Sequence, residues 1–416
     1  MGGLAVSNPA DTFCIITNPA GLSLLTDNRI DLDGLLQLTS GSVDVAANHL
    51  TNPGKETLFS ENDMLFGGNI GYSHQFDAPV TFGIAAVQLA AHSHYIDMFP
   101  PALPFNFNVS PGGNFRMSNL VVGSWYESYR FAPAISHRPL GWFMWGLALN
   151  FDYTITSFKT TLKNKPIPRT YGFDDHDYGA TNSNQIYFIQ EPTDAWGAGA
   201  TLGLLFIPQE WLRIGISGTS PSLPNTHTTK AKAYITFREN YYLTYDKGPT
   251  VQGGNKFALP TPAKVSGGAS FSFSDLVVFG ADATYTNWSW SFAGVDMDFA
   301  GYDINFPLGW VDQWVIAAGG MLHLPKGIAM RGGYNYASTL IRRDEHIGYV
   351  YPSYIKHHLT VGGGMELPWF AFNLGYEYGM PMTVNPNKNS HFGHLFHHSQ
   401  VVQQDQILSA MISVDF

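Results

Sequence analysis

Residues 359–379 read Leu-Thr-Val-Gly-Gly-Gly-Met-Glu-Leu-Pro-Trp-Phe-Ala-Phe-Asn-Leu-Gly-Tyr-Glu-Tyr-Gly, and this stretch decides the fold class. On either side of Pro368 and Trp369, nearly every second residue is apolar or aromatic, and the residues between them are small or polar. A period of two that persists over about ten residues predicts a β-strand with one apolar face. The sequence therefore predicts two such strands joined by a tight turn.

The same alternation recurs along the chain, at residues 263–273, 277–285 and 408–416 among others. Short, mostly proline-bearing turns are expected at 76–79, 136–140, 207–210, 273–275, 324–327 and 367–369. Long polar segments are expected at 41–62, 92–113, 159–194, 220–258, 292–310, 338–356 and 380–402. Short turns on one side and long loops on the other are typical of outer-membrane barrels. We therefore expect an all-β fold, a transmembrane antiparallel β-barrel of about fourteen strands, with both chain ends on the periplasmic side.

Composition agrees with a barrel and excludes other classes. Charged residues make up 13% of the chain and aromatic residues 14%, yet the mean hydropathy is only -0.06. A helical membrane protein would be far more apolar, and no apolar run is long enough for a transmembrane helix. In a barrel strand only every second residue meets lipid, which accounts for a low charged fraction together with a mean hydropathy near zero. The net charge of -10 argues against nucleic acid as a partner, and the single cysteine, Cys14, excludes an internal disulfide.

Tryptophans are expected to form two aromatic girdles at the membrane surfaces. Trp142, Trp211 and Trp369 lie beside the expected short turns. The tryptophans near the expected outer ends are Trp196, Trp288, Trp290, Trp310 and Trp314. Girdles of this kind flank the apolar band of outer-membrane barrels. The alternative is that some of these side chains fill a core.

Several short motifs follow one another along the chain. Residues 11–22 read Asp-Thr-Phe-Cys-Ile-Ile-Thr-Asn-Pro-Ala-Gly-Leu, with an acidic residue and a short spacer before Asn18, Pro19 and Ala20. The other motifs are Leu-Pro-Thr-Pro-Ala-Lys-Val-Ser-Gly at 259–267, Ala-Asp-Ala-Thr-Tyr-Thr-Asn-Trp-Ser at 281–289 and Ile-Ala-Met-Arg-Gly-Gly-Tyr at 328–334. This ordered set resembles the FadL/TodX family of outer-membrane transporters, in which the Asn-Pro-Ala motif lies in an N-terminal hatch that plugs the barrel. The resemblance thus implies a hatch at residues 1–28 and a barrel at 29–416.

The resemblance also implies a function. Family members take up long-chain fatty acids or other hydrophobic small molecules passively, so we expect a channel without cofactor, metal or catalysis. The expected partners are a hydrophobic ligand and outer-membrane lipid, and the chain is expected to act as a monomer. In the family, a kink in the third strand opens a lateral gap to the membrane. The matching residues here are Ala91, His92 and Ser93, next to Ala90.

Two long loops of the family form an apolar groove that captures the ligand first. The candidate residues here are Phe173, Tyr187, Phe188, Tyr234, Phe237, Tyr241 and Tyr242. Apolar side chains on an outward loop need either mutual cover or a ligand. The alternative is that these residues merely continue the strands outward.

Five charged residues fall on the polar face of their strands and are expected in the lumen: Lys264, Asp282, Arg331, Glu366 and Glu377. A lysine or arginine facing lipid at the midplane would cost about 2–4 kcal/mol. We expect these groups to pair with one another or with the hatch. The pairing could be purely structural, or it could hold the hatch and shape the ligand path.

Other functions remain as alternatives. A general water-filled porin shares the strand pattern, although a hatch motif and apolar loops disfavour it. An enzyme is disfavoured because no nucleophile elbow, zinc-protease motif or phosphate-binding loop is present. A soluble all-β binding protein would not need two tiers of loops. The histidine-rich residues 391–398, with His92, His94, His357 and His358, match no familiar metal spacing, and an exposed loop is the simpler interpretation.

Overall fold

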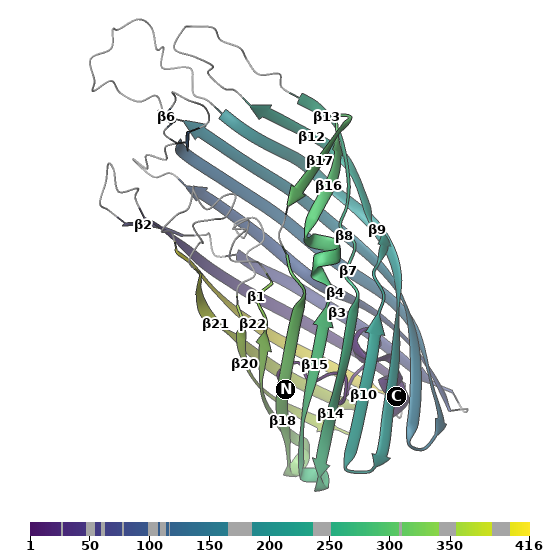
Figure 1. The fold of residues 1–416 in the computed structure, drawn as a ribbon. Coiled ribbons are helices and arrows are strands. Elements are labelled where there is room, and N and C mark those ends of the chain that lie inside the picture. Colours follow the sequence, from purple (N-terminus) through teal and green to yellow (C-terminus); the bar gives the residue numbers. More distant parts are fainter. Residues whose placement is uncertain are drawn as a thin grey trace, which may run out of the picture.

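The computed structural model describes residues 1–25, 28–46, 55–59, 63–76, 79–98, 107–108, 114–115, 117–164, 185–235, 251–307, 310–340, 355–384 and 400–416. Within these residues, antiparallel strands form a closed ring of 14 (Figure 1), which confirms the predicted fold class. In order around the wall they are β1 (Arg29–Ala46), β3 (Asp63–Gln75), β4 (Val80–Met98), β7 (Met117–Leu140), β8 (Phe143–Asn164), β9 (Gln185–Gln209), β10 (Leu212–Thr219), β14 (Lys264–Phe273), β15 (Val277–Thr286), β18 (Gln313–Leu324), β19 (Ile328–Ala337), β20 (His357–Leu367), β21 (Phe370–Val384) and β22 (Gln400–Asp415). Pairing of β1 with both β22 and β3 closes the ring.

Shorter strands extend the wall beyond this ring. They are β2 (Lys55–Phe59) on β1, β11 (Leu223–Pro224) and β12 (Thr226–Ile235) on β9, β13 (Val251–Ala258) on β12, and the hairpin of β16 (Gly294–Phe299) and β17 (Tyr302–Pro307) on β13. Strands β5 (Phe107–Asn108) and β6 (Asn114–Phe115) form a separate pair. Strands β11 to β13 follow β10 in the chain, the β16–β17 hairpin follows β15 and α2, and Figure 1 shows β12, β13, β16 and β17 near the upper end of the barrel.

The hairpins at one end of the barrel are short, as the sequence predicts, but the turn expected at 136–140 is wrong, because these residues belong to β7 and the chain turns at 141–142. The 3-10 turns η2 (Ser274–Leu276) and η3 (Pro325–Gly327) join β14 to β15 and β18 to β19. Residues 141–142, 210–211 and 368–369 join the other described pairs of neighbouring strands at this end. No helix among the described residues is long and apolar enough to cross a membrane.

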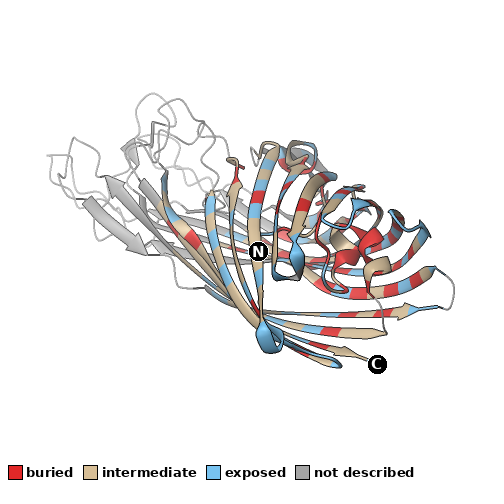
Figure 2. Cartoon of the chain, turned by 90° about the horizontal axis from the view of Figure 1, so that it is seen from below, coloured by how far each residue is buried: buried red, intermediate tan, exposed pale blue. Residues whose placement is uncertain are grey.

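Burial alternates along the strands, and Figure 2 shows buried and exposed residues in succession on the same ribbons. On β14 the outward Val265 is 59% exposed, whereas its neighbour Ser266 is buried. On β20 the outward Val361 is 60% exposed. An apolar side chain that remains this accessible in the isolated chain is explained if lipid covers it.

Tryptophans form both expected girdles, with two exceptions. Trp142, Trp211 and Trp369 are exposed near the short hairpins, and Trp196, Trp290 and Trp314 are exposed toward the other end. Trp288 and Trp310, however, pack against each other at 5.1 Å between ring centres, within an internal apolar cluster. The girdle prediction is wrong for these two residues. The reason for Trp288 is the helix α2 (Trp288–Phe292), which turns residues two apart to opposite sides.

A closed sheet with no free edge should resist SDS until it is heated. We expect the purified protein to migrate faster on SDS gels without heating than after boiling. Identical migration of the two samples would contradict a closed barrel.

Candidate functional site

Residues 1–25 lie inside the barrel, because they contact strands from every side of the ring. Four hydrogen bonds connect the segment to four different strands. Gly2 N–H donates to Thr360 Oγ1 on β20 at 2.8 Å, and Thr12 N–H donates to Asp31 Oδ2 on β1 at 2.7 Å. Asn18 Nδ2 donates to the Leu204 carbonyl on β9 at 3.1 Å, and Ser136 Oγ on β7 donates to the Ala20 carbonyl at 3.1 Å. A segment bonded to such widely separated strands has to cross the lumen. Its helical turns are α1 (Cys14–Thr17) and η1 (Pro19–Leu24).

Asn18, Pro19 and Ala20 form a tight, fully packed turn. Asn18 is buried, accepts the Ala20 N–H at 3.3 Å and donates to the Val6 carbonyl at 2.9 Å. Pro19 is the first residue of η1, where a missing N–H costs nothing. The wall approaches this turn so closely that a Cβ at Gly146 or Gly203 would collide with it. The structure thus gives the motif a rigid place against β8 and β9, while its role as a plug stays a prediction.

Asp282 on β15 holds the start of this segment. Its Oδ2 accepts the N–H groups of Ala5 and Val6, each at 2.8 Å, and its Oδ1 accepts the Ser7 hydroxyl at 2.6 Å. The carboxylate is buried, and no cation pairs with it among the described residues. A buried charge without a counter-ion depends on such hydrogen bonds. This lumen charge therefore bonds to the N-terminal segment, one of the two arrangements expected from the sequence.

The far part of the segment makes an apolar contact with the wall. Cys14, Ile15, Leu22 and Leu25 pack against small residues of β4, β7 and β8, which are Ala85, Val87, Ala132, Ala134 and Ala148. Leu89 of β4 also packs against this cluster. The segment therefore packs directly against β4, the strand whose pairing with its neighbours becomes irregular at Leu89.

At β3 and β4 the wall opens. Their ladder runs from Gln75 opposite Thr81 to Ile70 opposite Ala86 and ends there, although both strands continue. Strand β4 then has a register shift against β7 between Gln88 and Ala90, which leaves Leu89 as the extra residue of a β-bulge. The two strands separate at this bulge.

A hollow of about 650 Å³ occupies this part of the wall. Its lining includes the outward side chains of Ile70, Phe131 and Trp196 and the lumen-facing side chains of Asp33, Asn69 and Arg130. Residues of both faces of the wall thus contribute to the lining of one open hollow. It is also mostly apolar, as a path for a hydrophobic molecule has to be.

The residues predicted for a lateral opening lie just beyond this place. Ala91, His92 and Ser93 follow the bulge and pair in regular register with Glu127, Tyr126 and Trp125 of β7. The β4 residues that line the hollow are Ala86 and Val87. The sequence analysis did not predict Asn69 and Gln88. Asn69 directly follows two glycines, and Gln88 is the one amide within an otherwise apolar stretch of its strand, so both were visible signals.

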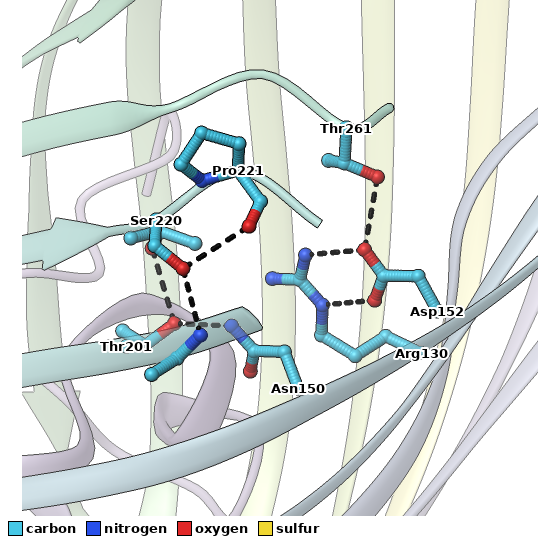
Figure 3. A network of polar contacts seen from close by, with 9 residues as sticks. Arg130, Asn150, Asp152, Thr201, Ser220, Pro221 and Thr261 are labelled. Atoms are coloured by element: carbon cyan, nitrogen blue, oxygen red, sulfur yellow. Dashed lines mark hydrogen bonds and ion pairs between the residues drawn. The ribbon is translucent and has the colours of Figure 1, made fainter. Parts of the chain in front are cut away.

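A buried ion pair crosses the lumen face of β7 and β8 (Figure 3). Arg130 donates Nε and Nη2 to the two carboxylate oxygens of Asp152 at 2.7 and 2.8 Å, and the Thr261 hydroxyl donates to Asp152 at 2.9 Å. Asn150 donates to Thr201 Oγ1 at 2.9 Å in a neighbouring group of hydrogen bonds (Figure 3). These residues were not predicted, although Arg130 and Asp152 alternate with apolar neighbours as lumen residues do.

The remaining predicted lumen charges are arranged differently. Arg331 donates to Glu366 at 3.1 Å and to Asn373 at 2.5 Å. Lys264 projects into the lumen with an exposed side chain, and no ion pair involves it within the described residues. The charges that act on it are Arg130 and Asp152. Glu377 also has no salt bridge in the described part of the chain.

The predicted loop groove is only partly described. Phe173, Phe237, Tyr241 and Tyr242 lie outside the described residues, as does the histidine-rich segment 391–398. Tyr187 and Phe188 belong to β9 and Tyr234 to β12, and Tyr234 is opposite Tyr187 in the ladder. The backbone of these three residues continues the wall, which agrees with the alternative interpretation of the pattern.

Comparison with known proteins gives the same fold. Residues 1–367 match the family described as outer membrane protein transport protein (OMPP1/FadL/TodX). The Pseudomonas putida toluene transporter TodX superposes with a TM-score of 0.73 at 18% identity, covering 100% of this chain and 96% of that chain. A Pseudomonas aeruginosa FadL homologue superposes with a TM-score of 0.73 at 15% identity, and the Ralstonia pickettii toluene transporter TbuX with a TM-score of 0.68 at 16% identity. Each of these two matches covers 100% of this chain and 96% of the other chain. No curated sequence matches the chain.

Removing the Asp282 carboxylate should release the start of the N-terminal segment. A hydrogen bond to a charged group contributes about 1.5–3 kcal/mol, and Asp282→Ala removes three. We expect the barrel to remain folded and its ion conductance in planar bilayers to rise. Asp303→Ala, at an exposed site on β17, is the control, and equal conductance of the two variants would contradict this role.

Asp11 should make the seating of the segment pH-dependent. Burial, followed by the nearby Asp31 carboxylate, raises the pKa of Asp11 from 3.8 to about 6 despite Arg29. Between pH 3.8 and about 6, the Asp11 carboxyl therefore keeps its proton in the seated segment and loses it in the released segment. Seating is strongest at low pH and weakens as the pH rises through about 6. We expect lower ion conductance at pH 4.5 than at pH 7.5, and Asp11→Asn should remove the difference. A parent protein with equal conductance at both values would refute the prediction.

Proposed function

The chain belongs to the OMPP1/FadL/TodX family of outer-membrane transport proteins, and we propose that it takes up hydrophobic molecules that carry an anionic head group, such as long-chain fatty acids. It is an outer-membrane β-barrel channel of that family. The observation that carries the uptake of hydrophobic molecules is the apolar hollow in the wall beside the N-terminal segment. Its volume of about 650 Å³ lies within the range of small-molecule sites.

The proposed path has three steps. A ligand binds at the outer loops, enters the lumen above the N-terminal residues 1–28, and leaves through the hollow between β3 and β4 toward the membrane. Residues 1–28 act as a plug that closes the lumen to ions. Support comes from the hydrogen bonds that tie this segment across the ring, which a general water-filled porin would not need. The path needs no chemical step and no cofactor.

The proposed preference for an anionic head group rests on Lys264. A cation inside a barrel is costly unless it is paired or hydrated, and neighbouring Asp152 is already held by Arg130 at 2.7 and 2.8 Å. The Lys264 ammonium is thus available to a ligand carboxylate in the lumen. We also propose that the chain acts as a monomer, because the 14-stranded ring closes on itself and therefore offers no free edge for strand pairing with a second copy.

A neutral hydrocarbon is the second candidate ligand. TodX and TbuX are toluene transporters, and the hollow is lined by aromatic side chains that include Phe131, Phe151 and Trp196. Flat aromatic molecules stack on such side chains. For this ligand class, Lys264 would have no role in binding.

Lys264→Met separates the two candidates. A charge-assisted hydrogen bond of about 1.5–3 kcal/mol corresponds to roughly ten- to hundredfold in affinity, so oleate binding should weaken by that factor. Toluene binding should stay within about twofold, since no charge is involved. Binding and uptake would be measured with reconstituted protein, with Lys326→Met at the η3 turn as the control.

If Lys264→Met leaves oleate binding unchanged, the head-group proposal fails and the hydrocarbon candidate is favoured. Native mass spectrometry of the purified barrel would add an independent readout. A co-purified fatty acid that is lost in Lys264→Met but not in Lys326→Met would support the first candidate.

A further inference from the structure

A chain of three polar residues lies where the β3–β4 ladder ends. Asn69 on β3 donates its Nδ2 to Asp33 Oδ2 on β1 at 2.8 Å. The Oδ1 of the same side chain accepts the backbone N–H of Gln88 on β4 at 2.9 Å. One amide therefore links three neighbouring strands at the edge of the hollow, and both Asp33 and Asn69 line that hollow.

This arrangement replaces a backbone pairing. If the ladder continued beyond Ile70 and Ala86, Gly68 would stand opposite Gln88. The N–H of Gln88 instead bonds to a side chain, and β4 moves into its bulge. An unpaired N–H in a membrane wall is costly, so a substitute acceptor is required if the strands are to separate.

The backbone of β3 makes room for the displaced residue. A Cβ added at Gly67 would collide with Oε1 of Gln88, which places the Gln88 side chain over this glycine. Gly67 and Asn69 are on the same face of β3, since they are two residues apart. The strand thus offers Gln88 a polar acceptor and a vacant space side by side.

We propose that Asn69 is the positioning residue that holds the wall open, with Asp33 orienting its amide. The proposal deepens the proposed function and rests on it, because an open wall matters only if ligand leaves through the hollow. Asn69 acts through Gln88 and need not touch the ligand. Without the side-chain acceptor, a continued ladder would pair the Gln88 N–H with the backbone of β3 at Gly68, and pairing there closes the gap.

The test compares Asn69→Leu with a rescue variant. Leucine keeps the approximate volume but removes both the acceptor and the donor. In the double variant Asp33→Asn/Asn69→Asp, the acceptor for Gln88 is retained and the donor is moved to position 33. Asn335→Leu is the matched control, because Asn335 is an asparagine on β19 that bonds His358 at 2.7 Å and does not line the hollow.

The first measurement is hydrogen–deuterium exchange of residues 86–92 in nanodiscs, which reports backbone pairing directly. We expect slower exchange in Asn69→Leu than in the parent and parent-like exchange in the double variant. Unchanged or faster exchange in Asn69→Leu would overturn the proposal. This measurement does not depend on any ligand, so it stands even if the proposed function fails.

The second measurement is uptake and binding of oleate and toluene by protein in proteoliposomes. Asn69→Leu should lower uptake of the transported probe about tenfold, the change that about 1.4 kcal/mol produces, with binding affinity unchanged. The double variant should recover uptake, and Asn335→Leu should match the parent. Full uptake by Asn69→Leu, or failure of the double variant to recover it, would overturn the positioning role. A parent that moves neither probe would instead refute the proposed function.

Discussion

The pairing of backbone N–H and C=O groups dictates this structure, because hydrocarbon offers them no other partner. The 14-stranded ring provides these partners because β1 pairs with both β22 and β3, so the ring has no free edge at its short-hairpin end. Where β3 and β4 part, the requirement still holds, and the side chain of Asn69 takes the place of a backbone carbonyl. An opening in the wall therefore has to supply another partner for such groups, and for the Gln88 N–H that partner is Asn69.

Closure has a second consequence, since alternation sends half of the side chains into the lumen. Glycines and alanines on β4, β7, β8 and β9 leave space there, and the N-terminal segment fills it with Ile15, Leu22 and the turn at Asn18. Larger residues at Gly146 or Gly203 would push the segment away from the wall. The small residues of the strands are thus as necessary for seating the segment as Asp282 is.

Properties that repeat along one strand could be predicted from the sequence, and properties of pairs of strands could not. Alternation such as that at residues 359–379 predicted the barrel, and the proline-bearing linkers predicted the short turns. The alternation within their own strands predicted that Lys264, Asp282 and Arg331 face the lumen. The pair of Arg130 and Asp152 depends on the register between β7 and β8, which places them opposite each other. The hollow depends on where one ladder stops. Trp288 was misplaced because a five-residue helix has no strand periodicity.

The N-terminal segment and the edge of the hollow both contact β4, which links the proposed plug to the proposed lateral exit. Leu89, the extra residue of the bulge, packs against the cluster that contains Ile15 and Leu22. Its neighbour Gln88 bonds to Asn69 at the edge of the hollow. A shift of the segment would therefore alter packing one residue away from the bond that separates β3 from β4. Since protein interiors are close-packed and transmit small displacements, the proposed plug and the proposed lateral exit are mechanically adjacent.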